Sequence, residues 1–141
     1  MDKTIKIIRS EQIERALQTT TRQYLVGNLS RPQELEHIAD DKIEVGITSY
    51  DEFNSEFPHY HTQAYEYQYI ISGETEYLDI ETGQTYSFTK GDFYVTPPGI
   101  KYAQRSQPGT AIFFFKTPPG NDKVNIDATD EVMTWLEQNS K

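Results

Sequence analysis

Residues 59–73 read HYHTQAYEYQYIISG, and this stretch decides both the fold and the position of the pocket. His59 and His61 stand two residues apart in a segment expected to be extended, so both imidazoles point to one face with their Cα atoms about 6.7 Å apart. Two imidazoles at that spacing can bind one metal ion, at about 2.1 Å each. After a short turn, Glu66 opens the next strand and is placed to add a carboxylate. Two histidines and one carboxylate form a common catalytic metal set that leaves positions open for water or substrate.

Short stretches with the composition of strands continue on both sides of these residues. From Ile43 to Thr48, apolar residues alternate with polar ones or glycine at the two-residue period of a strand. Turn residues separate the later runs and include a hairpin signal at 81–84. Further strands are expected at residues 65–71, 75–80, 85–88, 93–96 and 110–116. Many short strands at this spacing predict an all-β sandwich or barrel rather than a parallel α/β sheet.

Helices are expected only towards the two ends of the chain. Ser10 can cap a short helix that reaches Leu17. A second short helix is expected from Ser30 to near Asp40, because Ser30 and Gln33 have the spacing of a capping box. Both helices fall in the segment that precedes the strands.

The C-terminal segment is also expected to contain a helix. Either Asp127 or Thr129 can cap it, and its apolar face is formed by Val132, Trp135 and Leu136. A chain of 141 residues has the size of one domain. We therefore predict a single domain with an N-terminal arm at 1–42, a barrel core at 43–117 and a C-terminal extension at 118–141.

Composition and charge exclude several classes of function. The chain has no cysteine, so disulfides, thiolate metal sites and thiol nucleophiles are excluded, and any metal must be held by nitrogen and oxygen. The net charge is −9 and the sequence pI is about 4.7, which is unfavourable for binding nucleic acid or anionic membranes. No apolar run is long enough for a signal peptide or a membrane span. The cytoplasm is the expected location.

Two motifs stand in order along the chain and carry a family resemblance. The first is His59-x-His61, four residues, Glu66, six residues and Gly73, and the second is Gly91, five residues and Pro97-x-Gly99. Together they resemble the two motifs of the cupin superfamily, and the resemblance covers about half the chain. It implies a double-stranded β-helix, which is a jelly-roll barrel that can hold a ligand between its sheets.

The resemblance also implies a metal site, with three departures from the family pattern. Phe53 stands where the first motif has a glycine, Ser106 where the second has its final asparagine, and Tyr102 where the second has a histidine. That histidine is the family's fourth metal ligand. A divalent metal (Fe, Mn, Ni, Co or Zn) would therefore be held by His59, His61 and Glu66 alone.

The remaining site residues are assigned from their positions near these motifs. A tyrosine has an ordinary pKa near 10, so Tyr102 is expected to be a hydrogen-bond donor or general acid rather than a ligand. Glu66 is the second candidate catalytic residue. Gln68 shares the inner face of its strand with Glu66 and is expected to contact substrate. Arg105 is placed to contact an anionic group of the substrate, together with Tyr102.

The resemblance leaves three functions open. The first is a metal-dependent enzyme, such as a dioxygenase, isomerase or lyase acting on a small compound. The second is a metal-free enzyme, for example a sugar-nucleotide isomerase or epimerase, in which His59 or His61 is the base and Tyr102 the acid. The third is a binding module that senses a small molecule and catalyses nothing. Fold alone does not choose among them, because one barrel supports many functions.

The outer face of the strand that carries Glu66 suggests a partner. If Glu66 points into the barrel, alternation turns Tyr65, Tyr67, Tyr69 and Ile71 outwards. Tyrosine is enriched in the cores of protein interfaces, so this face is expected either to form a homodimer interface or to be covered by the N-terminal arm. We favour the homodimer.

Overall fold

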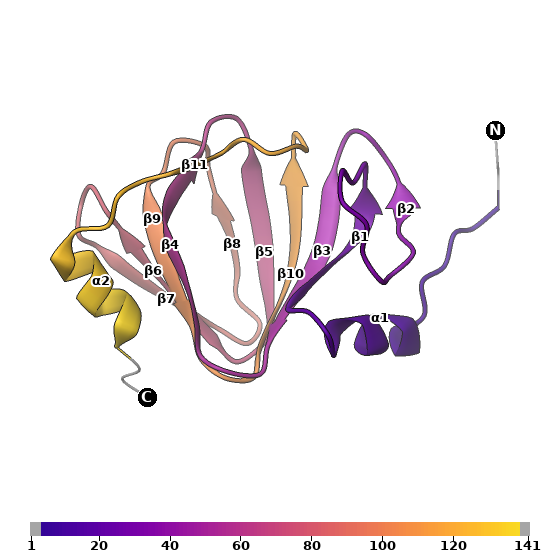
Figure 1. Cartoon of the computed structure of the whole chain (residues 1–141), viewed down its shortest axis with the longest axis horizontal. Helices are drawn as coiled ribbons and strands as arrows, with labels where there is room; N and C mark the ends of the chain where they lie inside the picture. The colour runs from indigo at the N-terminus through magenta and orange to yellow at the C-terminus, as the bar shows by residue number, and fades with distance from the viewer. Residues whose placement is uncertain (1–3, 139–141) are drawn as a thin grey trace.

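The computed structural model describes residues 4–138 and places two β-sheets face to face, with one short helix near each end of the chain (Figure 1). The larger sheet contains, in spatial order, β2 (Ile38–Ala39), β1 (Arg22–Gly27), β3 (Glu44–Tyr50), β10 (Thr110–Thr117), β5 (Tyr65–Ser72) and β8 (Phe93–Thr96). The smaller sheet contains β11 (Lys123–Asn125), β4 (Asn54–His61), β9 (Tyr102–Ser106), β6 (Glu74–Asp79) and β7 (Thr85–Thr89). The fold is an all-β double-stranded β-helix, as the sequence predicted.

The inner face of the larger sheet follows the two-residue alternation of its sequence. β10 pairs antiparallel with β3 on one side and with β5 on the other. Ile112 and Phe114 are buried inside the barrel, and their partners on β5 are Ile70 and Gln68. Because Gln68 lies on this inner face, Glu66, two residues earlier on the strand, faces the interior as well.

The turn between β5 and β6 depends on one glycine. Gly73 adopts φ +79, a conformation that residues with a side chain rarely adopt. A Cβ atom at this position would lie 2.5 Å from the Cα atom of Thr110. The hydroxyl of Thr110 accepts a hydrogen bond from the backbone N–H of Glu74 at 3.0 Å. The first motif therefore ends in a glycine because the chain makes a close approach to β10 there.

A bulge in β4 determines which of its residues face the interior. Glu56 pairs with Gln104 of β9, and His59 pairs with Tyr102, so three steps along β4 correspond to two along β9. A regular strand would place residues three apart on opposite faces. The extra residue puts both Glu56 and His59 on the inner face of the smaller sheet.

The helix at the C-terminal end covers the outside of the smaller sheet. α2 (Asp130–Glu137) begins after Thr129, whose side chain accepts a hydrogen bond from the backbone N–H of Val132. Val132 and Leu136 are buried with Ala103 of β9 in one apolar cluster. In Figure 1, α2 lies at the opposite end of the molecule from α1 (Ser10–Leu17). Both helices were expected from the sequence.

The prediction of a second helix between Ser30 and Asp40 is wrong. The segment contains no helix and contributes β2 to the larger sheet. The side chain of Gln33 bonds both the N–H and the C=O of Tyr24 in β1, so it ties this segment to a strand instead of capping a helix. The sheets also take in β1 and β11, which lie outside the predicted core of 43–117. Among residues 4–138, no helix is long and apolar enough to cross a membrane.

Candidate functional site

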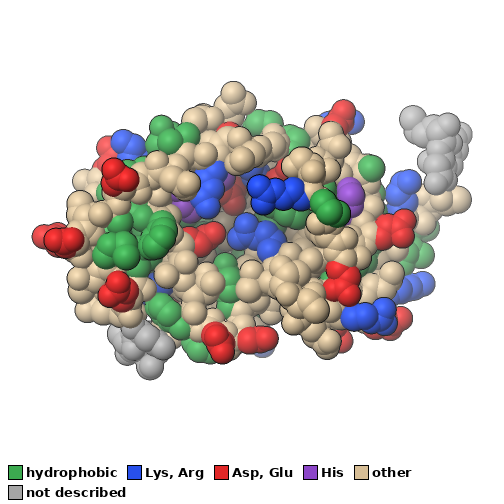
Figure 2. Space-filling view, in the orientation of Figure 1, with side chains coloured by type: hydrophobic (Ala, Val, Ile, Leu, Met, Phe, Trp, Pro, Cys, Tyr) green, Lys and Arg blue, Asp and Glu red, His purple; other side chains and the backbone are tan. Residues whose placement is uncertain are grey.

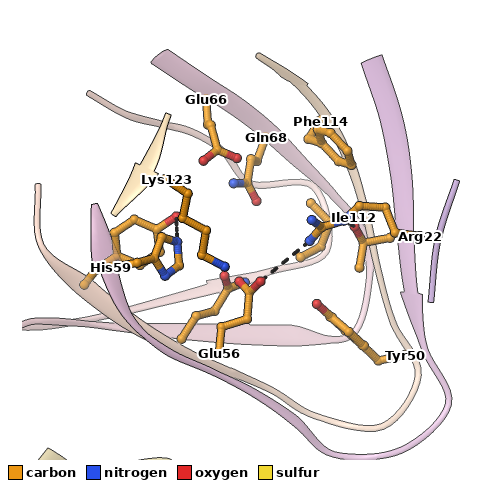
Figure 3. A pocket seen from close by; sticks show the side chains of 12 residues that line it. Arg22, Tyr50, Glu56, His59, Glu66, Gln68, Ile112, Phe114 and Lys123 are labelled. Carbon is orange, nitrogen blue, oxygen red and sulfur yellow. Dashed lines mark hydrogen bonds and ion pairs between the residues drawn. The ribbon is translucent and has the colours of Figure 1, made fainter. Parts of the chain in front are cut away.

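A small polar cavity of about 60 Å³ lies inside the barrel, between the two sheets (Figure 3). Six strands contribute polar side chains to its wall, and β10 contributes apolar ones. The polar side chains are Arg22 of β1, Thr48 and Tyr50 of β3, Glu56 and His59 of β4, Glu66 and Gln68 of β5, Tyr102 and Gln104 of β9, and Lys123 of β11. In the space-filling view, basic and acidic side chains gather in the middle of the face shown, between the sheets (Figure 2). The barrel interior is therefore a polar site that contains both signs of charge.

His59 is hydrogen-bonded at both ring nitrogens. Nδ1 lies 2.8 Å from the carbonyl oxygen of Phe57, and Nε2 lies 3.1 Å from the hydroxyl of Tyr102. A carbonyl oxygen only accepts, so Nδ1 carries a hydrogen and donates it. Burial lowers the pKa of His59, which favours the neutral ring. The lone pair of Nε2 then accepts a hydrogen bond from Tyr102, whose own pKa burial raises well above its ordinary value.

His61 lies between two carboxylates. Its Nε2 is 2.6 Å from Glu66 and its Nδ1 is 2.8 Å from Asp122. Burial acts to lower the pKa of His61, but hydrogen bonds and charge from Glu66 and Asp122 outweigh burial and raise it. Burial likewise acts to raise the pKa of Glu66, yet His61 holds that pKa below its ordinary value. The imidazole is therefore an imidazolium that fixes Glu66 in the cavity wall.

Asp122, in the loop after β10, is itself held from several sides. One carboxylate oxygen accepts hydrogen bonds from the backbone N–H groups of Gln63 and Ala64, at 2.9 and 2.8 Å. Lys116 of β10 lies 3.4 Å from the other oxygen. Although burial acts to raise the pKa of Asp122, these donors and His61 hold it far below its ordinary value. Asp122 therefore ties the turn at residues 62–64, between β4 and β5, to the loop after β10.

The opposite wall of the cavity carries the remaining charges. The Nε of Arg22 donates to Thr48 at 3.0 Å, and its guanidinium lies 3.8 Å from Glu56. Burial acts to lower the pKa of Arg22, but the acidic groups around it, led by Glu56, together outweigh burial and raise that pKa, so the guanidinium stays protonated. Burial raises the pKa of Tyr50 to about 12, which keeps its hydroxyl neutral. Figure 3 shows Lys123 extending towards Glu56 from the side of His59.

The comparisons with known proteins agree with this geometry. The family model described as "Cupin domain" matches residues 51–114, which include both motifs and the strands that carry His59, Glu66 and Tyr102. This barrel is a cupin domain. No curated protein sequence matches the chain.

Solved structures similar to this chain are also cupin-like barrels. A conserved protein with a double-stranded β-helix domain from Klebsiella pneumoniae is 22% identical, with a TM-score of 0.52, 63% of this chain and 78% of that chain covered. The polyketide cyclase RemF from Streptomyces resistomycificus is 17% identical, with a TM-score of 0.55 and 71% of each chain covered. Streptomyces PAC13, solved with uridine, is 14% identical, with a TM-score of 0.54, 65% of this chain and 74% of that chain covered. At these identities the likeness shows the fold alone.

Cupin barrels often bind a divalent metal, and His59, His61 and Glu66 are the residues expected to hold one in this cupin. All four ring nitrogens of the two histidines already have an oxygen partner. An imidazolium at His61 has no lone pair to offer a metal. Within residues 4–138, no group of three or more His, Asp or Glu side chains is arranged to hold a metal ion. The arrangement does not fit a metal centre, and the metal prediction is not confirmed.

The structure brings most of the predicted site residues together and separates one from them. His59, Glu66, Gln68 and Tyr102 line one cavity, and His61 stands directly behind Glu66. Arg105 does not reach the cavity, which corrects its predicted role in binding substrate. Its side chain lies on the outer face of β9, where it bonds Glu76 at 3.0 Å and the backbone oxygen of Trp135 at 2.8 Å. Its guanidinium also lies over the indole ring of Trp135.

Sequence reasoning missed four charged residues of the site. Arg22, Glu56 and Lys123 line the cavity, and Asp122 orients His61. The bulge in β4 conceals Glu56, because simple alternation from His59 turns it outwards. No local pattern marks the other three, because they come from strands and loops outside the two motifs.

Proposed function

We propose that this cupin barrel binds a small hydroxylated molecule and catalyses a metal-free proton transfer on it, with His59 as general base and Tyr102 as general acid. The observation that carries the proposal is the contact between the neutral Nε2 of His59 and the hydroxyl of Tyr102 at 3.1 Å. A base and an acid within hydrogen-bond distance of each other can remove a proton from one substrate atom and supply one to another.

The roles follow from the protonation states of the two groups. His59 donates through Nδ1 to a backbone oxygen, so its Nε2, which accepts from Tyr102, carries the lone pair that can take a proton from a bound substrate. The hydroxyl of Tyr102, kept protonated by burial, supplies a proton either to the leaving oxygen of the substrate or to the opposite face of the reacting carbon. Returning both groups to their starting states requires one proton to move from His59 to Tyr102 along their existing hydrogen bond. Elimination of water or inversion at a carbon next to a carbonyl has this proton balance.

The cavity wall supports a polar, hydroxylated substrate. Arg22 and Lys123 are donors, Glu56 and Glu66 are acceptors, and Gln68 can do both. A wall that mixes donors and acceptors suits a ring with several hydroxyl groups, such as a sugar or nucleoside. PAC13, which was solved with uridine in variants of one tyrosine and of one histidine, supports the choice of nucleosides as the first compounds to test.

Deuterium exchange tests the proposal whatever the product of the reaction is. The protein is incubated in heavy water with a panel of nucleosides, sugar nucleotides and free sugars, and incorporation of deuterium is read by mass spectrometry. We expect His59→Gln and Tyr102→Phe to lower the exchange rate about a hundredfold or more, as is usual for loss of a general acid or base. Tyr65→Phe, which removes a hydroxyl from a half-exposed tyrosine on the outer face of β5, serves as the control. Exchange that survives in both variants would remove the proposal.

The metal alternative needs a separate measurement. His59 and His61 have ring centroids 5.6 Å apart, so the two residues that the motif would use as metal ligands can be removed together in one variant. Metal content is measured on protein purified without a tag or chelator, beside a His59→Ala/His61→Ala double variant. We expect no stoichiometric Fe, Mn, Ni, Co or Zn in either protein. Near-equimolar metal that the double variant loses would favour the metal-dependent enzyme instead.

A further inference from the structure

A second cavity of about 210 Å³ lies on the other side of Tyr102, near β7 and β8, the end strands of the two sheets. The first cavity is lined mainly by polar and charged side chains, whereas this one is lined mainly by aromatic rings. Five aromatic rings line it: Tyr77, Tyr86, Phe88, Tyr94 and Tyr102. The proton transfer proposed above uses only the face of Tyr102 that meets His59, so this aromatic cavity has no role in that proposal.

Several of these rings meet at nearly right angles, so they do not form a pair of parallel faces that could hold a planar ligand. The ring of Tyr77 is inclined at 80° to Phe88 and at 77° to Tyr94, with centroids 5.8 and 5.3 Å apart. Phe88 and Tyr94 are stacked on each other at 3.8 Å, so no planar ligand fits between them. Tyr86 continues the wall parallel to Phe88 and is 43% exposed, which places it at the rim. The shape is that of a cage for a rounded group.

Two hydrogen bonds fix the inner wall of the cage. The hydroxyl of Tyr94 donates to Gln68 at 2.8 Å and lies 3.0 Å from the hydroxyl of Tyr77. Both hydroxyls are therefore turned towards each other and Gln68, and their polar groups are satisfied within the protein. The aromatic surfaces are formed in advance and need no rearrangement to receive a ligand.

The charge of the cavity selects the kind of ligand. Among the described residues that line it, Asp79 is the only charged side chain, and no Lys, Arg or His contributes. One oxygen of Asp79 accepts from the backbone of Glu81 and Thr82, which fixes the carboxylate at the end of β6. The faces of aromatic rings carry negative electrostatic potential and attract cations. Aromatic walls with one carboxylate are suited to a cation whose substituents are apolar.

We propose that this cavity binds a small organic cation of the quaternary or methylated ammonium class, with its methyl groups against Tyr77, Tyr86 and Phe88 and its charge balanced by Asp79. An inorganic cation would gain little from rings that cannot replace its water, and a neutral apolar group would gain nothing from Asp79. The net charge of −9 on the chain further favours a cationic ligand.

The test compares choline with 3,3-dimethylbutan-1-ol, a neutral molecule of nearly the same shape in which carbon replaces the nitrogen. Binding of each to the full-length chain is measured by isothermal titration calorimetry. We expect choline to bind at least about tenfold more tightly than the neutral alcohol, the size of a cation–aromatic interaction in a partly desolvated site. Equal affinity for the two would overturn the assignment to cations, and no binding of choline would overturn the site.

Variants locate the binding in this cavity. Tyr86→Leu should weaken choline about three- to fivefold, and Asp79→Asn should weaken it about fivefold while keeping an oxygen for the turn. Tyr65→Leu is the matched control, because Tyr65 is also a half-exposed tyrosine on a strand but lies on the outer face of β5. Affinity that changes with Tyr65→Leu and not with Tyr86→Leu would place the ligand elsewhere. The readout is binding, so failure here leaves the proton-transfer proposal untouched, and the converse also holds.

Discussion

Replacing Asp122 by asparagine should destabilise the barrel through a single hydrogen bond. The amide oxygen of asparagine can still accept from the backbone N–H groups of Gln63 and Ala64. Its NH₂ group then faces Nδ1 of His61, which is also a donor, at the present distance of 2.8 Å. The side chains of His61 and Asp122 are only 10% and 17% exposed, so solvent screens the pair weakly. Loss of one hydrogen bond between charged groups costs about 1.5–3 kcal/mol, equivalent here to a fall in Tm of about 5–10 °C.

The cost should depend on pH in a defined direction. The pKa of His61 is raised in the folded state, so its contribution to stability is complete below about pH 6.5 and is lost as the pH rises through the folded value. The pKa of Asp122 is lowered, so its contribution is complete above about pH 3.9 and is lost as the pH falls through the folded value. The difference between wild type and Asp122→Asn should therefore be largest between about pH 3.9 and 6.5 and shrink on both sides.

Urea unfolding across this pH range measures the effect. Asp92→Asn is the matched control, because Asp92 accepts one backbone hydrogen bond in an exposed turn and has no imidazolium beside it. That change should alter the free energy of unfolding by no more than about 0.5 kcal/mol. A loss for Asp122→Asn as small as the control, or one that stays constant with pH, would refute the assignment of His61 as an imidazolium between two carboxylates.

Three further predictions test the fold and its surfaces. Gly73→Ala should lower the free energy of unfolding by about 3 kcal/mol or more. Gly83→Ala should lower it by about 1 kcal/mol, because Gly83 has a similar φ but open space around it. Urea unfolding that ranks the two variants the other way would contradict the close approach at the first turn. Arg105→Met should loosen the C-terminal turn of α2 and shift the emission of Trp135 to longer wavelength. Unchanged emission would mean that this turn is held without the guanidinium. We expect the chain to be a homodimer through the outer face of β5, where the side chain of Tyr69 is 45% exposed. Tyr69→Lys should therefore give a monomer by light scattering. A monomeric wild type would refute the predicted dimer.

The motifs predicted the barrel and the centre of its site because they combine two kinds of local information. Glycine at 73 marks a turn that only this residue tolerates, and alternation places Glu66 and Gln68 on one face of β5. The same spacing placed His59 and His61 on a common face of β4, where they lie with ring centroids 5.6 Å apart. Where a single strand runs regularly, residue spacing alone fixed the geometry.

The errors arise where the geometry is not local. Arg105 is three residues after Tyr102 on a regular strand, so alternation alone excludes it from the cavity, and only nearness to the second motif had suggested it. Glu56 is also three residues from His59 but shares its face, because β4 has a bulge that no residue type announces. Asp122 reaches His61 across 61 residues of chain, a distance over which the sequence carries no spacing to interpret.

The position of Arg22 and Lys123 has a consequence for how such chains diversify. Both lie in the cavity wall, yet both fall outside residues 51–114, the segment that identifies the barrel as a cupin. A chain could therefore keep each motif residue unchanged and exchange its ligand by altering only the flanking strands β1 and β11. Grafting those two strands from one cupin onto another, with the rest of the barrel left intact, would transfer the ligand preference of the donor to the recipient.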